Sequence, residues 1–227
     1  LSIGGFHFGE PTRITASCRY GDDAIIDIER EVELGGNLHA KGVMILAAYL
    51  GSYYAADKPL SMAASIVFEQ NYGEIDGDSA TVAELCALLS AIAKIPLKQS
   101  VAITGSMNQF GQVQAIGGVN EKIEGFYDVC EMMGMNGSQG VIIPRSNMQH
   151  LMLKPEVRQS VENRLFHIYA VDTIADAIAI LTDHEVGEVD ASGQYPADSF
   201  NAAVAARLAN WAELNKHDKE TSHETDD

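Results

Sequence analysis

The chain lacks any long hydrophobic segment: none of its 227 residues lie in a run near the ~18 consecutive apolar residues that a membrane helix needs. Basic side chains are also scarce, because 15 lysines and arginines stand against 32 aspartates and glutamates, giving a net charge of −17. Such a charge repels the phosphates of nucleic acids and of anionic membranes. We therefore expect no membrane association and no nucleic-acid partner for this chain.

Cysteine is rare as well. The three cysteines, Cys18, Cys86 and Cys130, are odd in number and far apart in the sequence. This pattern excludes a disulfide framework and a zinc framework, and it is typical of buried thiols in a reducing compartment. We therefore expect a cytoplasmic protein.

Several motifs for cofactors and metals are missing. There is no G-x-x-x-x-G-K-[ST] phosphate loop, no H-E-x-x-H zinc motif and no G-x-G-x-x-G turn opening a helix, and the seven histidines are scattered. We therefore expect no cofactor and no metal in this chain, and no ATP hydrolysis by it. The chain begins with Leu1 rather than methionine, and we expect it to be part of a longer protein.

Strands alternate with helices over most of the chain, which predicts an α/β fold in which helices flank a mixed sheet. Residues 12–20 and 24–34 are expected to pair as a hairpin through Gly21-Asp22-Asp23. Residues 79–95 form a strongly helical run, with Asp78 expected as its cap. The pattern predicts one domain over residues 1–183.

Residues 184–227 form an acidic C-terminal extension. Residues 183–227 hold 11 acidic and 3 basic side chains, and one amphipathic helix is predicted at about 197–215. Its apolar positions, at helical spacing, are Phe200, Val204, Leu208, Trp211 and Leu214. Two roles remain open for this helix, packing on its own domain or binding a partner. The last twelve residues are polar and are expected to be disordered.

Ser79 is the first candidate for chemistry. Gly77-Asp78-Ser79-Ala80-Thr81 joins a loop to the helical run, which places Ser79 in the first turn, where backbone N–H groups are unpaired. These groups could stabilise an oxyanion, and the small Gly77 and Ala80 leave room for a substrate carbonyl. A serine at a helix start is also a common cap, so both interpretations stay open.

Lys122 is the candidate base that a nucleophilic serine needs. It lies at the edge of an apolar helical stripe formed by Val119, Ile123, Phe126, Cys130 and Met133. Burial there would lower the pKa of the lysine and let it act as a general base, whereas a lysine that reaches solvent would be ordinary. At the start of another predicted helix, His39 and Lys41 are interpreted as surface caps, with a cleft or subunit contact as the alternative.

Four segments in this order resemble the proteolytic domain of Lon-type ATP-dependent proteases. Residues 75–80 resemble the loop of the catalytic serine, residues 102–106 the central strand and its turn, and residues 111–122 the segment of the catalytic lysine; residues 141–144 resemble the next strand. The match covers roughly residues 10–183. Phe68-Glu69-Gln70 and Gly77-Asp78-Ser79 are more similar to the archaeal (B-type) branch and to Lon-related bacterial proteins.

This resemblance implies a Lon-like fold and a serine endopeptidase with a Ser79–Lys122 dyad. It implies that Thr104 orients the lysine and that backbone N–H groups from Asp78 to Ala80 form the oxyanion hole. It also implies a homo-hexameric ring that cleaves unfolded proteins, fed by an AAA+ ATPase module outside this chain that uses the ATP.

Asp78 departs from the housekeeping branch, which has proline there. A carboxylate at Asp76 or Asp78 could pair with Lys122, raise its pKa and favour an inactive resting state. The alternative function is a non-catalytic Lon-like module for assembly or substrate binding. The presence of both Ser79 and Lys122 counts against that alternative.

Overall fold

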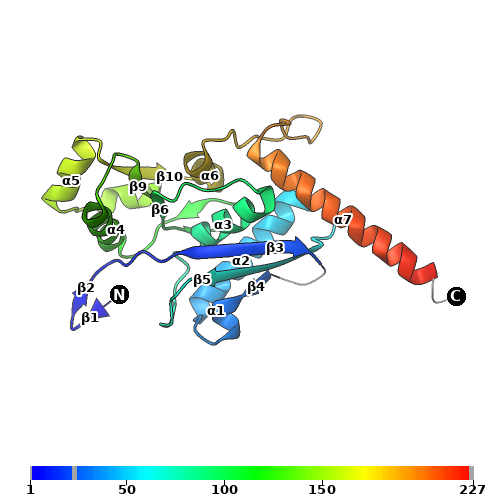
Figure 1. The fold of residues 1–227 in the computed structure, drawn as a ribbon, viewed down its shortest axis with the longest axis horizontal. Coiled ribbons are helices and arrows are strands. Elements are labelled where there is room, and N and C mark those ends of the chain that lie inside the picture. Colours follow the sequence, from blue (N-terminus) through cyan, green and yellow to red (C-terminus); the bar gives the residue numbers. More distant parts are fainter. Residues whose placement is uncertain (1, 22–24, 225–227) are drawn as a thin grey trace.

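Two three-stranded sheets form the frame of the protein, seen in a computed structural model that describes residues 2–21 and 25–224 (Figure 1). Their strand orders are β3-β5-β4 and β10-β9-β6, and two short pairs, β1-β2 and β7-β8, accompany them. The strands are β1 Ser2–Ile3, β2 Phe6–His7, β3 Ile14–Tyr20, β4 Ile25–Asp27, β5 Met62–Phe68, β6 Val101–Ile103, β7 Ser106–Met107, β8 Val113–Gln114, β9 Gln139–Pro144 and β10 Phe166–Val171.

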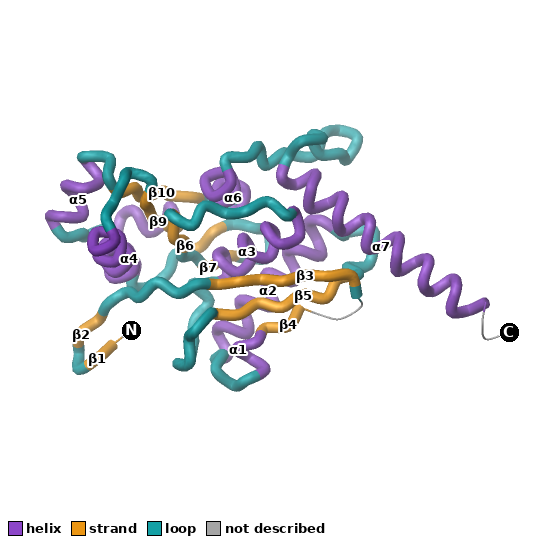
Figure 2. The backbone as a smooth tube through the Cα atoms, in the orientation of Figure 1, coloured by secondary structure: helices purple, strands orange, loops and turns teal. Residues whose placement is uncertain are grey.

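Helices flank the sheets (Figure 2), which confirms the α/β class, although two separate sheets take the place of one. The helices are α1 Ile28–Glu31, α2 Asn37–Tyr54, α3 Thr81–Ala93, α4 Val119–Met133, α5 Pro155–Glu162, α6 Ile174–Thr182 and α7 Phe200–Glu224, with a 3-10 helix at Arg145–His150.

The first sheet corrects the expected hairpin. β3 is antiparallel to β5 along its full length, whereas β4 is parallel to β5, so β5 lies between the two strands that were expected to pair. β4 also ends at Asp27 and continues directly into α1, which shortens the strand expected over 24–34. Asp22, Asp23 and Ala24 lie outside the described residues.

The second sheet is entirely parallel and is buried on both faces. Val141, Ile142 and Ile143 of its central strand β9 are 2%, 0% and 0% exposed. Helix α4 contacts β9 and helix α5 contacts β10. The continuous apolar strands of a parallel sheet need such helical cover. β9 includes residues 141–144, the segment that resembles a strand of the Lon-type domain.

Helix α3 runs through the centre and contacts β3, α2, α6 and α7. Leu85, Leu88, Leu89 and Ile92 on it are fully buried, and burial of each such side chain is worth about 1.5–3 kcal/mol. This packing fixes the axis of the helix and therefore the place of the turn at its N-terminus. The helix begins at Thr81, two residues later than expected.

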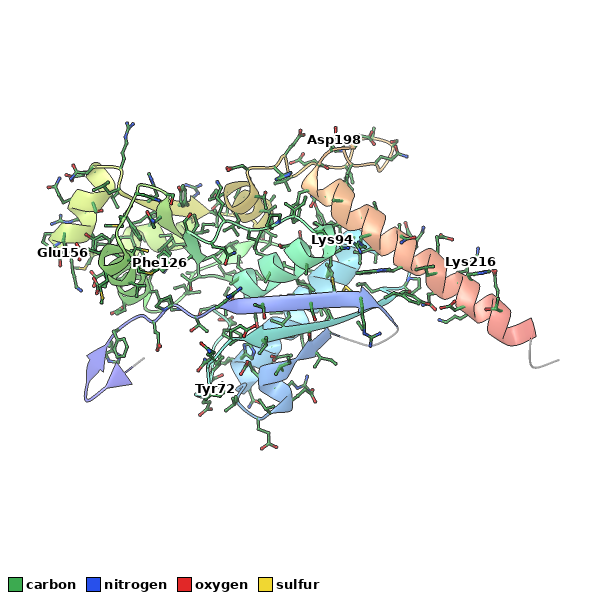
Figure 3. All side chains as sticks on the ribbon, viewed as in Figure 1. Tyr72, Lys94, Phe126, Glu156, Asp198 and Lys216 are labelled. Carbon is green, nitrogen blue, oxygen red and sulfur yellow. The ribbon has the colours of Figure 1, made fainter. Side chains whose placement is uncertain are left out.

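Helix α7 is longer than the predicted 197–215 and projects from the body at its C-terminal end (Figure 1), where Figure 3 labels Lys216. Phe200, Val204, Leu208 and Trp211 are buried in the same hydrophobic cluster as α3, whereas Leu214 is 43% exposed. The last twelve residues, expected to be disordered, are helical up to Glu224, and 225–227 lie outside the described part. No helix in the described residues is long and apolar enough to cross a membrane.

Candidate active site

Ser79 lies in a turn that leads into α3, rather than in the helix itself. Gly77 has a φ of +126°, a conformation that side chains with a Cβ rarely adopt. The backbone N–H and the hydroxyl of Thr81 both donate to the carbonyl of Asp78, at 3.2 and 2.8 Å. Ala80 is the N-cap residue, and the side chain of Asp78 makes no capping bond, which corrects the expected cap. The turn thus presents Ser79 just ahead of the helix N-terminus.

Free backbone donors accompany the serine. Within the described part of the chain, the N–H groups of Ser79 and Ala80 have no hydrogen-bond acceptor, while the N–H of Val82 donates to the carbonyl of Gly105 at 3.1 Å. Unpaired N–H groups at a helix N-terminus stabilise negative charge. The turn can therefore receive a carbonyl oxygen as it becomes an oxyanion.

Lys122 reaches the serine from α4. This helix starts after Gly118, which has a left-handed φ of +67°, and the backbone N–H of Lys122 donates to the carbonyl of Gly118 at 3.0 Å. The side-chain Nζ of Lys122 is 2.8 Å from Ser79 Oγ. That separation is within the reach required of a nucleophile and its base. On the same helix, Met133 is 83% exposed, and Tyr127, 3% exposed, occupies the apolar stripe instead.

Thr104 holds both members of the pair. Lys122 Nζ donates to Thr104 Oγ1 at 3.3 Å, and the same hydroxyl donates to the carbonyl of Ser79 at 3.2 Å. The backbone N–H of Gly105 donates to that carbonyl at 2.7 Å. The turn after β6 therefore contacts the lysine and also holds the serine turn through hydrogen bonds.

Burial lowers the pKa of Lys122 below its usual value, because the apolar surroundings disfavour the ammonium form. The nearby charge of Asp78 opposes this effect and is the smaller of the two. The Asp78 carboxylate is held elsewhere, since its Oδ2 accepts from the hydroxyl of Ser106 at 2.8 Å. The net effect favours the neutral amine that a general base requires.

Asp76 lies apart from the lysine. Its Oδ1 accepts from the backbone N–H of Leu38 at 3.2 Å, in the first turn of α2. No ion pair within 4.0 Å joins Lys122 to Asp76 or Asp78 among the described residues. The two carboxylates therefore do not form the resting pair that the sequence left open. The described part of the chain also holds no group of three or more His, Cys, Asp or Glu side chains arranged to bind a metal.

Two clefts meet at this site. One, of about 360 Å³, includes Ser79, Thr104 and Lys122 and is otherwise mainly apolar. Its remaining apolar lining includes Phe68, Ala80, Ala83, Cys86, Ala87, Val101, Ile103 and Phe126. The other, of about 830 Å³, also includes Lys122 and is lined by Glu10, Glu69, Glu74 and Glu121. An extended chain could therefore pass the dyad through an apolar cleft and a polar one.

An N-terminal strap, residues 8–13, separates the clefts. Glu10 and Arg13 line both of them. At Gly9 the strap crosses α4 so closely that a Cβ there would lie 2.3 Å from the carbonyl of Glu121. A Cβ on Gly125 would likewise lie 2.1 Å from the carbonyl of Gly9.

Gly125→Ala is therefore expected to lift the strap from α4, even though alanine favours a helix by up to about 1 kcal/mol over glycine. We expect faster limited proteolysis at residues 8–13. Gly117→Ala is the matched control, because a Cβ at Gly117 meets nothing within 4 Å. If both variants resist proteolysis as the original chain does, the strap does not depend on this contact.

The sequence did not point to the strap, to Ser106 as the partner of Asp78, or to Gly105 as a donor to Ser79. A usable signal existed for the apolar cleft: Ala80, Ala83 and Ala87 are small residues that follow the serine at helical spacing. In contrast to the expected surface cap, His39 is 1% exposed, while Lys41 is exposed.

Known proteins share sequence with this chain. The family model of the Lon protease (S16) C-terminal proteolytic domain matches residues 68–183. A protein of Escherichia coli K12 named "Putative Lon protease homolog" is 52% identical over 174 residues, covering 77% of this chain and 30% of the relative. A relative of the same name from Haemophilus influenzae is 44% identical over 209 residues, covering 92% and 35%.

The archaeal Lon protease of Methanocaldococcus jannaschii is 37% identical over 154 residues, covering 63% of this chain and 21% of the relative. The chain thus spans about a third of the length of the bacterial relatives that it matches. The family match covers about half of this chain and includes Ser79, Thr104 and Lys122, so this chain belongs to the Lon protease (S16) family.

Proposed function

We propose that this chain is a serine endopeptidase domain in which Ser79 is the nucleophile and Lys122 the general base. The observation that carries the proposal is the 2.8 Å separation of Ser79 Oγ and Lys122 Nζ. It is supported by the lowered pKa of Lys122, which burial causes, and by the free N–H groups beside the serine.

In the first step, Ser79 Oγ attacks the carbonyl carbon of the scissile bond while its proton passes to the neutral amine of Lys122. The carbonyl electrons move to the oxygen, which the N–H groups of Ser79 and Ala80 stabilise. When the intermediate collapses, the C–N bond breaks and the Lys122 ammonium gives its proton to the leaving amine. Lys122 then takes a proton from a water molecule as the water oxygen attacks the acyl carbon. When the ester C–O bond to Ser79 breaks, Lys122 returns this proton to Ser79 Oγ, which restores the free serine and the neutral amine.

Thr104 is proposed to keep the lysine directed at Ser79 through this cycle, because its hydroxyl contacts the lysine and the serine turn together. We further propose unfolded proteins as substrates, since an extended chain can lie along the two clefts. By likeness to the Lon family, we propose that an AAA+ ATPase module outside this chain delivers them, and that the chains assemble as homo-hexamers. The ATP would be used by that module.

Ser79→Ala tests the proposal. We expect it to lower cleavage of an unfolded fluorescent casein by at least about 10³-fold, because loss of a nucleophilic serine removes the covalent route. A fluorophosphonate should label Ser79 in the original chain, with the position read by mass spectrometry. Ser146→Ala is the control, since Ser146 is exposed and lies in the 3-10 helix after β9.

Cleavage by Ser79→Ala at the rate of the original chain would contradict the proposal. Rings in sedimentation with no labelling and no cleavage, even with the ATPase module present, would instead favour a non-catalytic assembly module.

A further inference from the structure

A group of ionisable side chains is buried beneath the serine turn. This buried cluster consists of Asp27 at the end of β4, Glu29 on α1, His39 on α2 and Glu84 on α3. Their exposed fractions are 4%, 2%, 1% and 0%. The proposed mechanism uses none of them. Three acids and one base in a dry environment need a reason, because an unpaired buried charge is costly.

His39 is shared between two carboxylates. Its Nε2 lies 3.1 Å from Asp27 Oδ2 and 3.7 Å from Glu84 Oε1. The edge of its ring meets Phe68, with centroids 5.5 Å apart and an angle of 77° between the planes. Glu29 is held separately, because its Oε1 accepts from the backbone N–H of Phe68 at 3.0 Å. The protonated His39 can therefore balance only one of the two acids beside it.

The remaining carboxyl oxygens have no other support. Apart from the contacts with His39, both oxygens of Asp27 and both oxygens of Glu84 are buried without a hydrogen-bond partner within the described residues. If Asp27 and Glu84 were both ionised beside a protonated His39, these three groups would hold one uncompensated negative charge. A proton retained on Glu84 removes that charge.

The cluster lies next to the contact that positions Ser79. His39 is about one helical turn before Gly42 on α2, and Glu84 is about one turn after Thr81 on α3. Gly42 packs so tightly against α3 that a Cβ on it would lie 2.3 Å from Thr81 Oγ1. Thr81 in turn donates to the carbonyl of Asp78, the residue before the serine. The spacing of α2 and α3 at the cluster therefore bears directly on the serine turn.

We propose that His39 and Glu84 are positioning residues: the proton held between them keeps α2 against α3 and so keeps the serine turn in place. When the proton is lost, charge repulsion in the cluster separates the two helices and displaces the turn. The structural part of this proposal stands alone, whereas its effect on catalysis rests on the proposed function.

The direction of the pH effect follows from the surroundings of each group. The pKa of Glu84 is raised to about 7, mainly by burial; the charge of His39 lowers it in part, and the charges of Asp27 and Glu29 add to the rise. Burial would lower the pKa of His39, but its bond to Asp27 and the charges of Glu84, Asp27 and Glu29 raise it overall. Both groups bind protons more tightly in the folded state than in the unfolded state. Their contribution to stability is therefore present at low pH and is lost as the pH rises through their folded pKa values.

Thermal unfolding at pH 5.5 to 8.5 tests the first part. We expect the Tm of the original chain to fall by about 5–10 °C across this range. The Tm of Glu84→Gln, whose amide is neutral at every pH, should fall by less than half as much. At pH 8.5 it should be higher than the Tm of the original chain. Asp27→Asn should reduce the pH dependence of the Tm in the same way. It replaces Glu84→Gln in the test if that variant does not fold. The lowered pKa of Lys122 makes its contribution to stability rise with pH, opposite to that of the cluster. The test therefore compares the change in Tm between variants.

Glu156→Gln is the matched control, because Glu156 is exposed and also lies in the first turn of a helix, α5. Figure 3 shows it at the far end of the molecule from α7. Its profile should parallel that of the original chain. Equal pH dependence of the original chain, Glu84→Gln and Asp27→Asn would overturn the proposal.

Hydrogen exchange of the segment 76–84, corrected for the intrinsic effect of pH, tests the second part. In the original chain, we expect protection of this segment to fall at least tenfold between pH 6 and 8.5, and in Glu84→Gln to change less than threefold. In the original chain, the rate at which a fluorophosphonate labels Ser79 should also decline at alkaline pH. This decline should be absent in Glu84→Gln. A Tm effect without an exchange effect would overturn the positioning role. The expected exchange result with no labelling at any pH would support that role and count against the proposed function alone.

Discussion

Lys122→Met is expected to abolish cleavage, with a loss of at least about 10³-fold in kcat/KM, while the chain keeps its fold. Methionine matches the length and apolar stem of lysine, so the packing between α4 and the serine turn survives. What disappears is the amine 2.8 Å from Ser79 Oγ. Without it, no described side chain at the site is placed to take the serine proton.

Lys122→Arg separates proton transfer from charge. A guanidinium stays protonated in proteins and cannot act as a base, so this variant should be as inactive as Lys122→Met. Lys41→Met is the control, because Lys41 is an exposed lysine on α2. Cleavage by Lys122→Arg at a rate near that of the original chain would show that the lysine serves only as a positive charge.

The pH profile of kcat/KM reports the same group. Burial lowers the pKa of Lys122, so the neutral amine becomes populated below the usual range for lysine. In Glu84→Gln, which is expected to lack the alkaline decline, activity should therefore rise with pH, with an apparent pKa below that of an exposed lysine. A rise only near the ordinary lysine pKa would indicate that the site opens to water in solution.

Removal of α7 is expected to unfold the protein, although the helix belongs to the acidic extension rather than to the matched family segment. Phe200, Val204, Leu208 and Trp211 are part of the hydrophobic cluster that surrounds α3. Polar contacts reinforce this packing: Tyr54 donates to Asn201 Oδ1 at 2.6 Å, and Asn215 donates to Ser61 Oγ at 2.7 Å. A chain ending at Asp183 should show no cooperative thermal transition.

Trp211→Ala gives the graded version of this test. The indole is 6% exposed and lies under the guanidinium of Arg207, 5.5 Å from the ring centroid. Its removal should cost about 3–5 kcal/mol and lower the Tm by roughly 10 °C. Leu214→Ala on the same helix should change stability by less than about 1 kcal/mol, because Leu214 is 43% exposed. A folded chain of residues 1–183 with an unchanged Tm would assign α7 to another role.

Local patterns predicted the helices well where one face is buried. In α4 the 3.6-residue period identified Val119, Ile123 and Cys130 as buried positions, and all three are. The period failed near the end of that helix, where Met133 is exposed. All three cysteines are free thiols, and Cys86 and Cys130 are buried. Both findings agree with the expectation of buried thiols rather than disulfides.

Strand pairing was beyond the sequence. The segments before and after residues 22–24 look like a hairpin because a turn signal separates them, yet β5, more than 30 residues later, lies between them. Strand pairing depends on burial between segments that are far apart in the sequence, and a short stretch of sequence does not show which segments will pack together. The same limit applies to His39, whose place at a helix start suggested a surface cap until α1 and α3 enclosed it.

By itself, the sequence determined the α/β class, the family, and the serine and lysine that merit testing, because periodicity and motif order are local properties of the chain. The tertiary structure alone decided how those residues meet. It brought Ser79 and Lys122, 43 positions apart, to 2.8 Å, directed Asp78 to Ser106 rather than to the lysine, and enclosed the Asp27–His39–Glu84 group. Distances, burial and the pKa shifts that follow arise from packing between distant segments, and only the folded chain contains them.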